Sequence, residues 1–426
     1  MTLAAPLSSE LKRKKSFARQ VIATSVGNAL EWFDIAVYGF FAVYISKAFF
    51  PSNDATTSLL LTFGTFGLSY LIRPIGGIVL GAYADRHGRK VSLLVSIVMM
   101  TFGTLAVAVM PTYQTIGVLA PLLVILARLV QGFSAGGEFG SSTAFLVEHM
   151  PERRGFVASW QFASQGLSAV LGAGFGALLT SAMSPADLQA WGWRLPFFFG
   201  VLIGPVGLYI RNNMEDAGAP PAGKDGSPVK DVFLRQKLAV LLGIGALAVS
   251  TAINYLIVYI PTYVVKTLNL SASVGFTASL VGSLAVMVLT PVAGAISDRI
   301  GRTTHMITVN LLLLITIYPA FYVLTNYPTP AVIIAAVFVV ATLKALYYGP
   351  LAALMAELLP AETRATGLGL GYNIGVTIFG GMGPAIMTAL GTVAFIGDMA
   401  PGYYLSLIAL LSLASLFTIR KLGATA

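Results

Sequence analysis

Apolar residues gather along this chain in stretches of about twenty residues or more, separated by short polar segments. As a helix, each stretch is long enough to cross a hydrocarbon layer of ~30 Å. Barrel strands would instead alternate apolar and polar residues, and these stretches do not alternate. We therefore predict an all-α integral membrane protein with twelve transmembrane helices. The expected spans are 17–46, 56–84, 91–110, 117–147, 156–183, 192–211, 237–265, 272–298, 303–324, 329–357, 366–390 and 402–420.

One long polar segment interrupts this pattern near the middle of the chain. Residues 212–236 are rich in Gly, Pro, Ala and charge, a composition typical of a linker or surface loop. Six expected spans precede it and six follow. The sequence thus predicts an N-terminal six-helix half at 1–211, a cytoplasmic linker loop at 212–236 and a C-terminal six-helix half at 237–426. Paired halves of this kind are the architecture of secondary transporters that rock around a central site.

Composition excludes several other classes of protein. With 56% hydrophobic and 10% charged residues, the chain is too apolar for a soluble globular protein. It has no cysteine, which excludes disulfides, thiolate metal ligands and cysteine nucleophiles. It also lacks the Gly-x-x-x-x-Gly-Lys-Ser/Thr loop of ATP-using proteins, and its three histidines fall at expected helix ends. We predict that the protein is not an enzyme and holds no cofactor and no metal.

The basic surplus of the chain, 26 Lys and Arg against 17 Asp and Glu, has an uneven distribution. If the amino terminus is cytoplasmic, almost every basic residue outside the spans falls on the cytoplasmic side, and only Lys47, Arg194 and Lys266 fall outside. This positive-inside pattern predicts that both termini are cytoplasmic. It also explains the surplus without a nucleic-acid partner. Because the polar start runs into a full-length span, we do not expect a cleaved signal peptide.

A charged turn occurs twice, after the second and the eighth span, at positions 213 residues apart. This offset is half of the 426 residues, so the two halves are related. In each copy, the second glycine (Gly88 or Gly301) is expected to allow a tight reversal with positive φ. The first glycine (Gly81 or Gly294) is expected to let a neighbouring helix approach closely. The repeated residues are Gly81, Asp85, Gly88 and Arg89, then Gly294, Asp298, Gly301 and Arg302.

A second repeated pair of charged segments follows the fourth and the tenth span. It supplies Glu148 and Arg154 in the first half, and Glu357 and Arg364 in the second. Together with the charged turns, these residues predict a gate that latches the halves on the cytoplasmic side. The alternative interpretation is that the charges serve only as positive-inside anchors.

The charged turn resembles the loop signature of the major facilitator superfamily, and the resemblance covers nearly the whole chain. Further runs resemble its metabolite:proton symporter branch, and within that branch the bacterial citrate:proton symporters. They are Gly27-Asn28-Ala-Leu-Glu31-Trp32-Phe33-Asp34 with Tyr38-Gly39, Arg73-Pro74-Ile-Gly76-Gly77, Arg128-Leu-Val-Gln131-Gly132-Phe-Ser-Ala-Gly-Gly137-Glu138 and Trp193-Arg194-Leu-Pro196-Phe197. The resemblance implies two pseudo-symmetric halves around a central cavity, lined by the first, fourth, seventh and tenth helices.

Six ionisable residues lie inside the expected spans, where each charge costs at least a few kcal/mol. Helical spacing sets Asn28, Glu31, Asp34 and Tyr38 on one face of the first span, and residues 128, 131 and 138 on one face of the fourth. Both faces must meet other helices or water. A purely structural ion-pair network is the alternative. The six are Glu31, Asp34, Arg73, Arg128, Glu138 and Lys344.

Charge suggests a role for each of these groups. Arg128 and Lys344, one from each half, could clamp a polycarboxylate from both sides, with Arg73 as a further cation. Neutral hydrogen bonds could come from other polar residues, for which helix-to-helix bonding is an equal alternative. These residues are Asn28, Tyr38, Gln131, Gln165, Tyr348 and Asn373.

Proton coupling needs a side chain that changes its charge near working pH. Burial and a neighbouring arginine shift the pKa of a carboxylate in opposite directions, so a membrane-embedded acid beside Arg128 or Arg73 could be poised. Glu138 and Asp34 are the first candidates, followed by Glu31.

The sequence thus predicts a monomeric, proton-coupled symporter in a bacterial cytoplasmic membrane, which imports citrate or a related di- or tricarboxylate by alternating access. A symporter for shikimate, α-ketoglutarate or proline and betaine is an alternative, although a zwitterion site would favour an aromatic cage with fewer bases. A non-coupled channel or sensor is the other. The expected partners are a small anionic substrate, protons and lipid.

Overall fold

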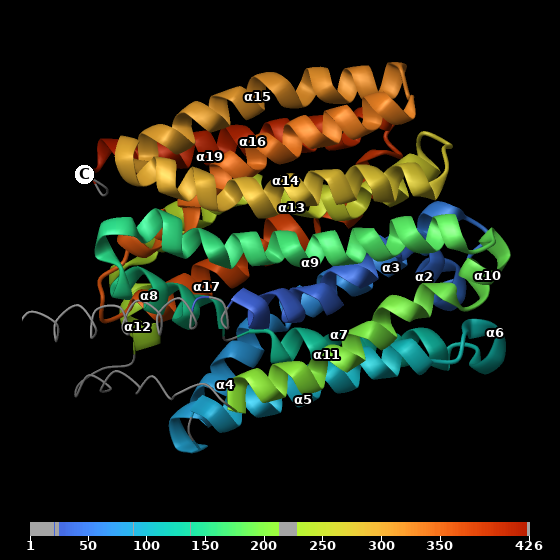
Figure 1. Ribbon diagram of the computed structural model, residues 1–426, viewed down its shortest axis with the longest axis horizontal. Coiled ribbons are helices and arrows are strands. Elements are labelled where there is room, and N and C mark those ends of the chain that lie inside the picture. The colour runs from blue at the N-terminus through green and yellow to red at the C-terminus, as the bar shows by residue number, and fades with distance from the viewer. Residues whose placement is uncertain (1–20, 22–24, 88, 137, 213–227, 424–426) are drawn as a thin grey trace, which may run out of the picture.

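Long helices lie side by side along the longest axis of the molecule (Figure 1). This computed structural model describes residues 21, 25–87, 89–136, 138–212 and 228–423. For some helical residues, Asp85, Arg89 and Glu138 among them, it describes the backbone only. We call the end that bears α12 and the C-terminus the α12 end, and the opposite end, with α6 and α10, the α10 end.

The helices up to Asn212 are called the N-terminal half below. They are Ser25–Phe40, α2 (Ala42–Phe49), α3 (Ala55–Leu71), α4 (Arg73–His87), α5 (Arg89–Val109), α6 (Tyr113–Ile116), α7 (Leu119–Ser134), α8 (Glu138–His149), η1 (Pro151–Arg153), α9 (Arg154–Ala182), α10 (Pro185–Ala190), η2 (Gly192–Arg194) and α11 (Leu195–Asn212).

The helices after the linker form the C-terminal half. They are α13 (Lys237–Lys266), α14 (Ala272–Ile300), α15 (Arg302–Asn326), α16 (Pro330–Glu357), α17 (Arg364–Val376), the π-helix η3 (Thr377–Gly381), α18 (Gly383–Leu390), η4 (Gly397–Met399) and α19 (Ala400–Lys421). The short helix α12 (Pro228–Arg235) occupies the last part of the predicted linker. The division into halves at residues 212–236 stays a prediction.

The predicted all-helical membrane architecture is confirmed. Among the described residues, nine helices are long and apolar enough to cross a membrane, and the pair Ser25–Phe40 and Ala42–Phe49, bent by 66°, makes a tenth. The shorter apolar helix Leu94–Val109, within α5, and the helix α11 lie at the two remaining expected spans. Large apolar side chains such as Leu202, Ile315 and Leu407 point outward, as a lipid-facing surface requires.

Several spans that look continuous in the sequence are broken in the structure. The second divides into α3 and α4 at Ile72, next to Pro74, which cannot donate a backbone hydrogen bond. The fourth divides into α7 and α8 around the Gly136 turn, and the eleventh passes through the π-helix η3.

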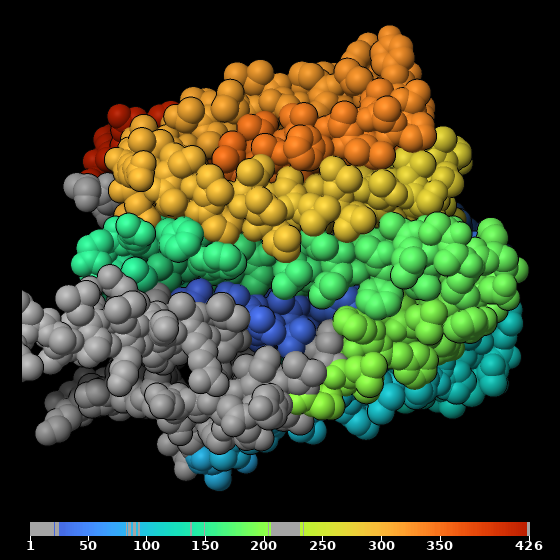
Figure 2. Space-filling view, in the orientation of Figure 1, coloured from blue at the N-terminus to red at the C-terminus, as the bar shows by residue number. Residues whose placement is uncertain are grey.

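The two halves meet most closely along α9 and α14, which lie in contact over most of their length (Figure 2). A Cβ atom on Gly294 would lie 2.9 Å from the carbonyl carbon of Gly155, and one on Gly166 would lie 2.8 Å from the backbone nitrogen of Met287. Backbone therefore packs directly on backbone at this contact.

The glycines of the repeated turn behave differently in the two halves. Gly301 has φ +88°, which confirms the predicted reversal, and Gly294 makes the predicted close approach. For Gly81 the prediction of a close approach is wrong, because a Cβ there meets no atom of the described residues within 4 Å. The reason is that α14 packs on α9, whereas this end of α4 is exposed. Gly88 lies outside the described residues.

Polar side chains hold the loop ends of the helices. Asp54 caps α3 by accepting hydrogen bonds from the Thr57 hydroxyl at 2.7 Å and from the backbone nitrogens of Thr57 and Thr56. These bonds, the Thr57 hydroxyl first, hold the pKa of the Asp54 carboxyl below its usual value. Arg194 donates to the carbonyls of Ala108 and Met110 at 2.7 and 2.8 Å, which caps the end of α5.

We therefore predict that alanine substitutions at equivalent glycines of the two repeats change the stability of the protein in different ways. We expect Gly294→Ala to destabilise the protein by about 1–3 kcal/mol, because the methyl group meets the backbone of Gly155. Gly81→Ala should be neutral or gain up to about 1 kcal/mol, since alanine favours the helix. Thermal unfolding of the purified variants in detergent measures the difference. Equal shifts for both variants would contradict the packing described here.

Candidate functional site

Arg128 lies on α7 in the interior of the N-terminal half, fully buried. Its guanidinium carbon is 4.4 Å from the ring centre of Tyr38 and 5.6 Å from that of Phe66. Arg128 Nη1 donates to Gln131 Oε1 at 2.7 Å, and Nη2 to Ser69 Oγ at 3.3 Å. The Nε donor has no hydrogen-bond partner in the described part of the chain. The contacts shown for this cation are thus to neutral groups.

A chain of hydrogen bonds leads from Arg128 to a buried carboxylate. Gln131, which binds Arg128, donates from Nε2 to Thr104 Oγ1 at 2.8 Å. Thr104 Oγ1 lies 2.8 Å from Asp34 Oδ2 and 3.0 Å from the carbonyl oxygen of Met100. Because a hydroxyl has one proton, Thr104 can donate to only one of these two oxygens at a time. We call Arg128, Gln131, Thr104 and Asp34 the relay.

Arg73 begins α4, with its side chain 1% exposed. Its guanidinium carbon lies 4.1 Å from the ring centre of Tyr70 and 4.8 Å from that of Trp32. Its Nε and Nη2 atoms have no hydrogen-bond partner within the residues that the structure describes. Donors of this kind are expensive to bury, so the site has unused capacity for an acceptor.

Lys344 supplies the cation of the C-terminal half, on α16, and is fully buried. Its Nζ donates to Asn254 Oδ1 at 2.9 Å and lies 4.0 Å from the ring centre of Tyr348. The Tyr348 hydroxyl donates to Gln165 Oε1 at 3.0 Å, and Gln165 Nε2 donates to the Tyr372 hydroxyl at 2.7 Å. Gln165 belongs to α9, so these bonds join the two halves.

Aromatic rings connect the three cation sites. Phe66 packs edge-on against Tyr70, with ring centres 5.3 Å apart, and against Tyr255 at 5.8 Å. The hydroxyls of Tyr70 and Tyr255 are 2.6 Å apart. Asn254, the partner of Lys344, precedes Tyr255 on α13. We call Trp32, Tyr38, Phe66, Tyr70, Tyr255, Tyr348 and Tyr372 the aromatic cluster.

The predicted cations thus surround one aromatic cluster, but solvent does not reach them. Arg73, Arg128 and Lys344 are each at most 1% exposed. In this conformation the centre that the resemblance describes as a cavity is therefore closed to solvent around the three cations, because the halves meet on both sides of the cluster. Toward the α10 end, Phe41 and Phe276 pack at 5.2 Å, and Phe63 and Tyr259 at 5.6 Å.

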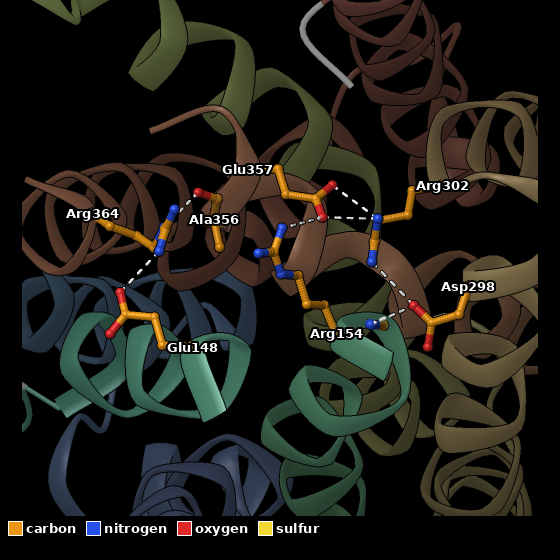
Figure 3. A network of polar contacts seen from close by, with 8 residues as sticks. Glu148, Arg154, Asp298, Arg302, Ala356, Glu357 and Arg364 are labelled. Carbon is orange, nitrogen blue, oxygen red and sulfur yellow. Dashed lines mark hydrogen bonds and ion pairs between the residues drawn. The ribbon is translucent and has the colours of Figure 1, made fainter. Parts of the chain in front are cut away.

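A network of charges joins the halves at the α12 end (Figure 3). Asp298 accepts hydrogen bonds from the backbone nitrogens of Gly155 and Phe156, at 2.8 and 3.0 Å, where α9 begins. Anions are favoured at this end of a helix. Arg302 pairs with Asp298 at 3.1 Å and with Glu357 at 2.8 Å.

Two further ion pairs of this network cross between the halves. Arg154 lies 3.5 Å from Glu357, and Arg364 lies 2.9 Å from Glu148. We call the network formed by Glu148, Arg154, Asp298, Arg302, Glu357 and Arg364 the charge latch. It contains the second copy of the repeated turn. The side chains of Asp85 and Arg89 from the first copy lie outside the described residues.

Other predicted site residues have contacts between helices. Asn28 Nδ2 donates to the carbonyl oxygen of Gln161 at 2.9 Å and to Ser164 Oγ at 2.7 Å. Asn373 Nδ2 donates to the carbonyl oxygen of Gly136 at 2.8 Å. These contacts favour the structural alternative for both. Glu31 is partly buried and lines a small cavity together with Asp34. The side chain of Glu138 lies outside the described residues.

Several residues of the site were not predicted from the sequence. Trp32, Ser69 and Tyr70 lie within four residues of predicted site residues, so helical neighbourhood could have indicated them. Tyr372 likewise directly precedes the predicted Asn373. The sequence also shows Asn254 and Tyr255 on a polar face of the seventh expected span. Thr104 comes from α5, and its sequence signal is only a polar residue in an apolar span, which specifies no partner.

A family comparison now identifies the class of protein. The model of the Major Facilitator Superfamily matches residues 24–384. The chain belongs to this superfamily of membrane transport proteins.

The chain is also similar to individual members of the superfamily over most of its length. The chain is 39% identical over 412 residues to a citrate-proton symporter of Klebsiella pneumoniae, covering 95% of this chain and 92% of the relative. It is 35% identical to the alpha-ketoglutarate permease of Escherichia coli, with 99% and 98% covered, and 32% identical to the proline/betaine transporter of the same species, with 95% and 83% covered. A solved D-xylose-proton symporter has the same fold, with a TM-score of 0.74, 16% identity and coverage of 93% and 97%.

Removing one acid of the charge latch should loosen the α12 end. We expect Asp298→Asn to cost the closed contact about 1–2 kcal/mol, roughly a five- to thirty-fold shift, because the start of α9 loses its anion. Ser159, fully buried behind this contact, offers a reporter, since the chain has no other cysteine after Ser159→Cys. The measurement is the rate of thiol labelling.

The matched control is Asp231→Asn, which removes an exposed ion pair of 3.9 Å within α12. Its labelling rate should equal that of the parent. Equal rates for Asp298→Asn and the parent would mean that the charges do not hold this end closed.

Proposed function

We propose that the protein is a proton-coupled symporter that imports citrate or a related di- or tricarboxylate by alternating access. The observation that carries the proposal is the group of three buried cations, contributed by both halves, around one closed aromatic cluster. Burying three cations is costly unless a negative partner arrives. The names of the relatives in Klebsiella pneumoniae and Escherichia coli support a carboxylate as that partner.

The hydrogen-bond donors of the site favour an anion with several oxygens. Among the described residues, Arg73 and Arg128 keep guanidinium donors without partners, and Lys344 donates to Asn254. Arginine presents a planar fork that matches a carboxylate, and lysine a point charge. A polycarboxylate could bind all three cations at once, which would bring the halves together around it.

The same geometry disfavours the zwitterion alternative. A quaternary ammonium group binds over the faces of aromatic rings. In this site, Arg73 covers faces of Trp32 and Tyr70, Arg128 a face of Tyr38, and Lys344 a face of Tyr348. The rings that would cage betaine therefore already bind cations of the protein. Closure on both sides of the cluster equally disfavours a simple channel.

Thr104 provides a physical basis for proton coupling. When Asp34 is ionised, the Thr104 hydroxyl donates to it and accepts from Gln131. When Asp34 is protonated, Asp34 donates to Thr104, and Thr104 turns its own proton to the carbonyl oxygen of Met100 at 3.0 Å. Either state satisfies Gln131, which positions Arg128. Asp34 can thus gain or lose a proton near the substrate-binding cation while the hydrogen bonds that position Arg128 stay in place. Glu138 and Glu31 remain further candidates.

Alternating access follows from two separate closures. We assign the α12 end to the cytoplasm, with both termini, because basic residues gather there while Lys47, Arg194 and Lys266 lie at the other end. The charge latch then closes the cytoplasmic side, and the packing of Phe41 on Phe276 closes the outside. Opening one closure at a time would carry the substrate across, as a monomer, in a bacterial cytoplasmic membrane.

The proposal is tested by ligand-induced thermal stabilisation of the purified protein. Citrate, tricarballylate, α-ketoglutarate, shikimate and betaine are compared at two pH values. We expect a di- or tricarboxylate to stabilise by about 2.7 kcal/mol at 100 times its Kd. Arg128→Gln and Lys344→Gln should each abolish the response, because a clamp needs both cations.

Arg194→Gln is the matched control, since this arginine caps α5 away from the aromatic cluster. It should keep the full ligand response even if its melting temperature is lower. Stabilisation by betaine and by none of the carboxylates would replace the proposed substrate with a zwitterion.

A second test addresses the relay. Thr104→Val keeps the shape of the side chain and removes the hydroxyl, so that Asp34 Oδ2 and Gln131 Nε2 lose their hydrogen bonds to it. We expect pH-driven citrate uptake in proteoliposomes to fall about tenfold or more, from a loss of about 1–3 kcal/mol. Thr104→Ser restores the hydroxyl and should stay within about twofold of the parent. Equal uptake by the valine and serine variants would exclude the relay.

A further inference from the structure

The small cavity beside Glu31 and Asp34 lies inside the N-terminal half, apart from the aromatic cluster. It has a volume of about 50 Å³ and is formed between the helix Ser25–Phe40, α5 and α11. We call it the chamber. Its wall includes Gly27, Glu31, Asp34, Ser96, Met100 and Gly204. A cavity of this size, with two carboxyl groups and two hydroxyl groups on its wall, has room for more than one water molecule.

We infer that the chamber is a hydrated path of its own for the proton, joining Asp34 to the solvent at the α12 end and separate from the path of the substrate. The inference rests on the proposed function, in which Asp34 is the proton site. It adds the route by which the proton leaves that site.

Asp34 faces both the relay and the chamber. Oδ2 is bound by Thr104 on the relay side, whereas Oδ1 has no hydrogen-bond partner in the described part of the protein, although the side chain is only 4% exposed. A Cβ on Gly200 would overlap Oδ1, and Gly200 is part of the chamber wall. The unpartnered oxygen therefore lies at the chamber, where water could bind it.

The chamber extends from Asp34 toward the α12 end. Gly27 precedes Asp34 by seven residues on the same helix, a rise of about 10 Å. Ser96 precedes Met100 by one turn on α5. Gly204 follows Gly200 by one turn on α11, which runs toward its end at Asn212. Gly27, Ser96 and Gly204 therefore all lie nearer the α12 end than Asp34, Met100 and Gly200.

The wall of the chamber suits a proton and excludes the substrate. Among the described residues of the wall, the charged groups are Glu31 and Asp34 from the first helix, and those from α5 and α11 are uncharged. The hydrogen bonds of Arg128 reach Asp34 through Gln131 and Thr104, on the side of Asp34 that faces the relay. Carboxylates repel a polycarboxylate, and 50 Å³ is far below the ~300 Å³ or more of a small-molecule site. Anion and proton thus use different entrances to one relay.

The test fills the chamber without touching the relay. Ile97, on the chamber wall, is replaced in Ile97→Phe, and Leu30→Phe fills the chamber from the first helix. The matched control is Val98→Phe, at the adjacent position, where the side chain is 56% exposed on the outer surface. In proteoliposomes, we expect pH-driven citrate uptake to fall by at least about tenfold in a filled variant, and citrate counterflow to stay within about twofold. The control should match the parent in both.

A substrate-independent measurement separates this inference from the proposed function. The infrared band of the protonated Asp34 carboxyl is identified by its loss in Asp34→Asn, and its exchange from H₂O to D₂O is timed. Exchange should slow about tenfold or more in a folded filled variant and be unchanged in Val98→Phe. If the parent shows no citrate counterflow, the proposed function fails, and the exchange rates still decide the path.

Three results would overturn the inference. The first is unchanged exchange and uptake in both filled variants. The second is an equal loss of counterflow and uptake in a filled variant that melts like the parent. The third is accumulation driven by a sodium gradient at equal pH, which would make the chamber a site for a metal cation.

Discussion

Placing three cations in the interior of a membrane protein is the constraint on which the rest of the site depends. A charge transferred into a medium of low dielectric loses several kcal/mol of hydration, and only close polar or aromatic groups can offset the loss. Arg73, Arg128 and Lys344 each lie against at least one ring face, and Arg128 and Lys344 also bind amide oxygens. These neutral groups stabilise a charge less than an anion does. The aromatic cluster therefore lowers the free-energy cost of burying these cations, and an anion at the same place would lower it further.

The halves are held together by ion pairs at the α12 end and by aromatic packing toward the α10 end. The charge latch uses ions that are partly exposed, with Arg302 at 19% and Glu357 at 16%, so water can solvate them when the contact opens. The closure toward the α10 end uses rings, whose separation exposes apolar surface. Salt should weaken the first far more than the second, because partly exposed ion pairs are screened. One molecule thus has two contacts that respond to different conditions.

Much of the fold could be predicted from the sequence, and much less of the site. Apolar stretches and the repeated turn gave twelve spans, because the bilayer fixes helix length and leaves little freedom. The breaks next to Ile72 and Gly136 were not predicted, since a proline or glycine inside a membrane helix is often accommodated without one. Arg128 and Asp34 were found because a charge in an apolar span is conspicuous. Thr104, which joins them, was not, since a threonine in a helix usually bonds within its own backbone and only the packing of α5 shows its partner.

The contact between Gly155 and Gly294 has a consequence for the rate of motion. Interlocked side chains must leave one set of rotamers and find another before two helices can roll over each other, which raises the barrier. Where backbone packs on backbone, as at Gly155 and Gly294, no side chains have to change rotamer. In the proposed alternating-access cycle, α9 and α14 would therefore shift past each other at Gly155 and Gly294 with a low barrier. The charge latch and the packing of Phe41 on Phe276 would hold the two end positions.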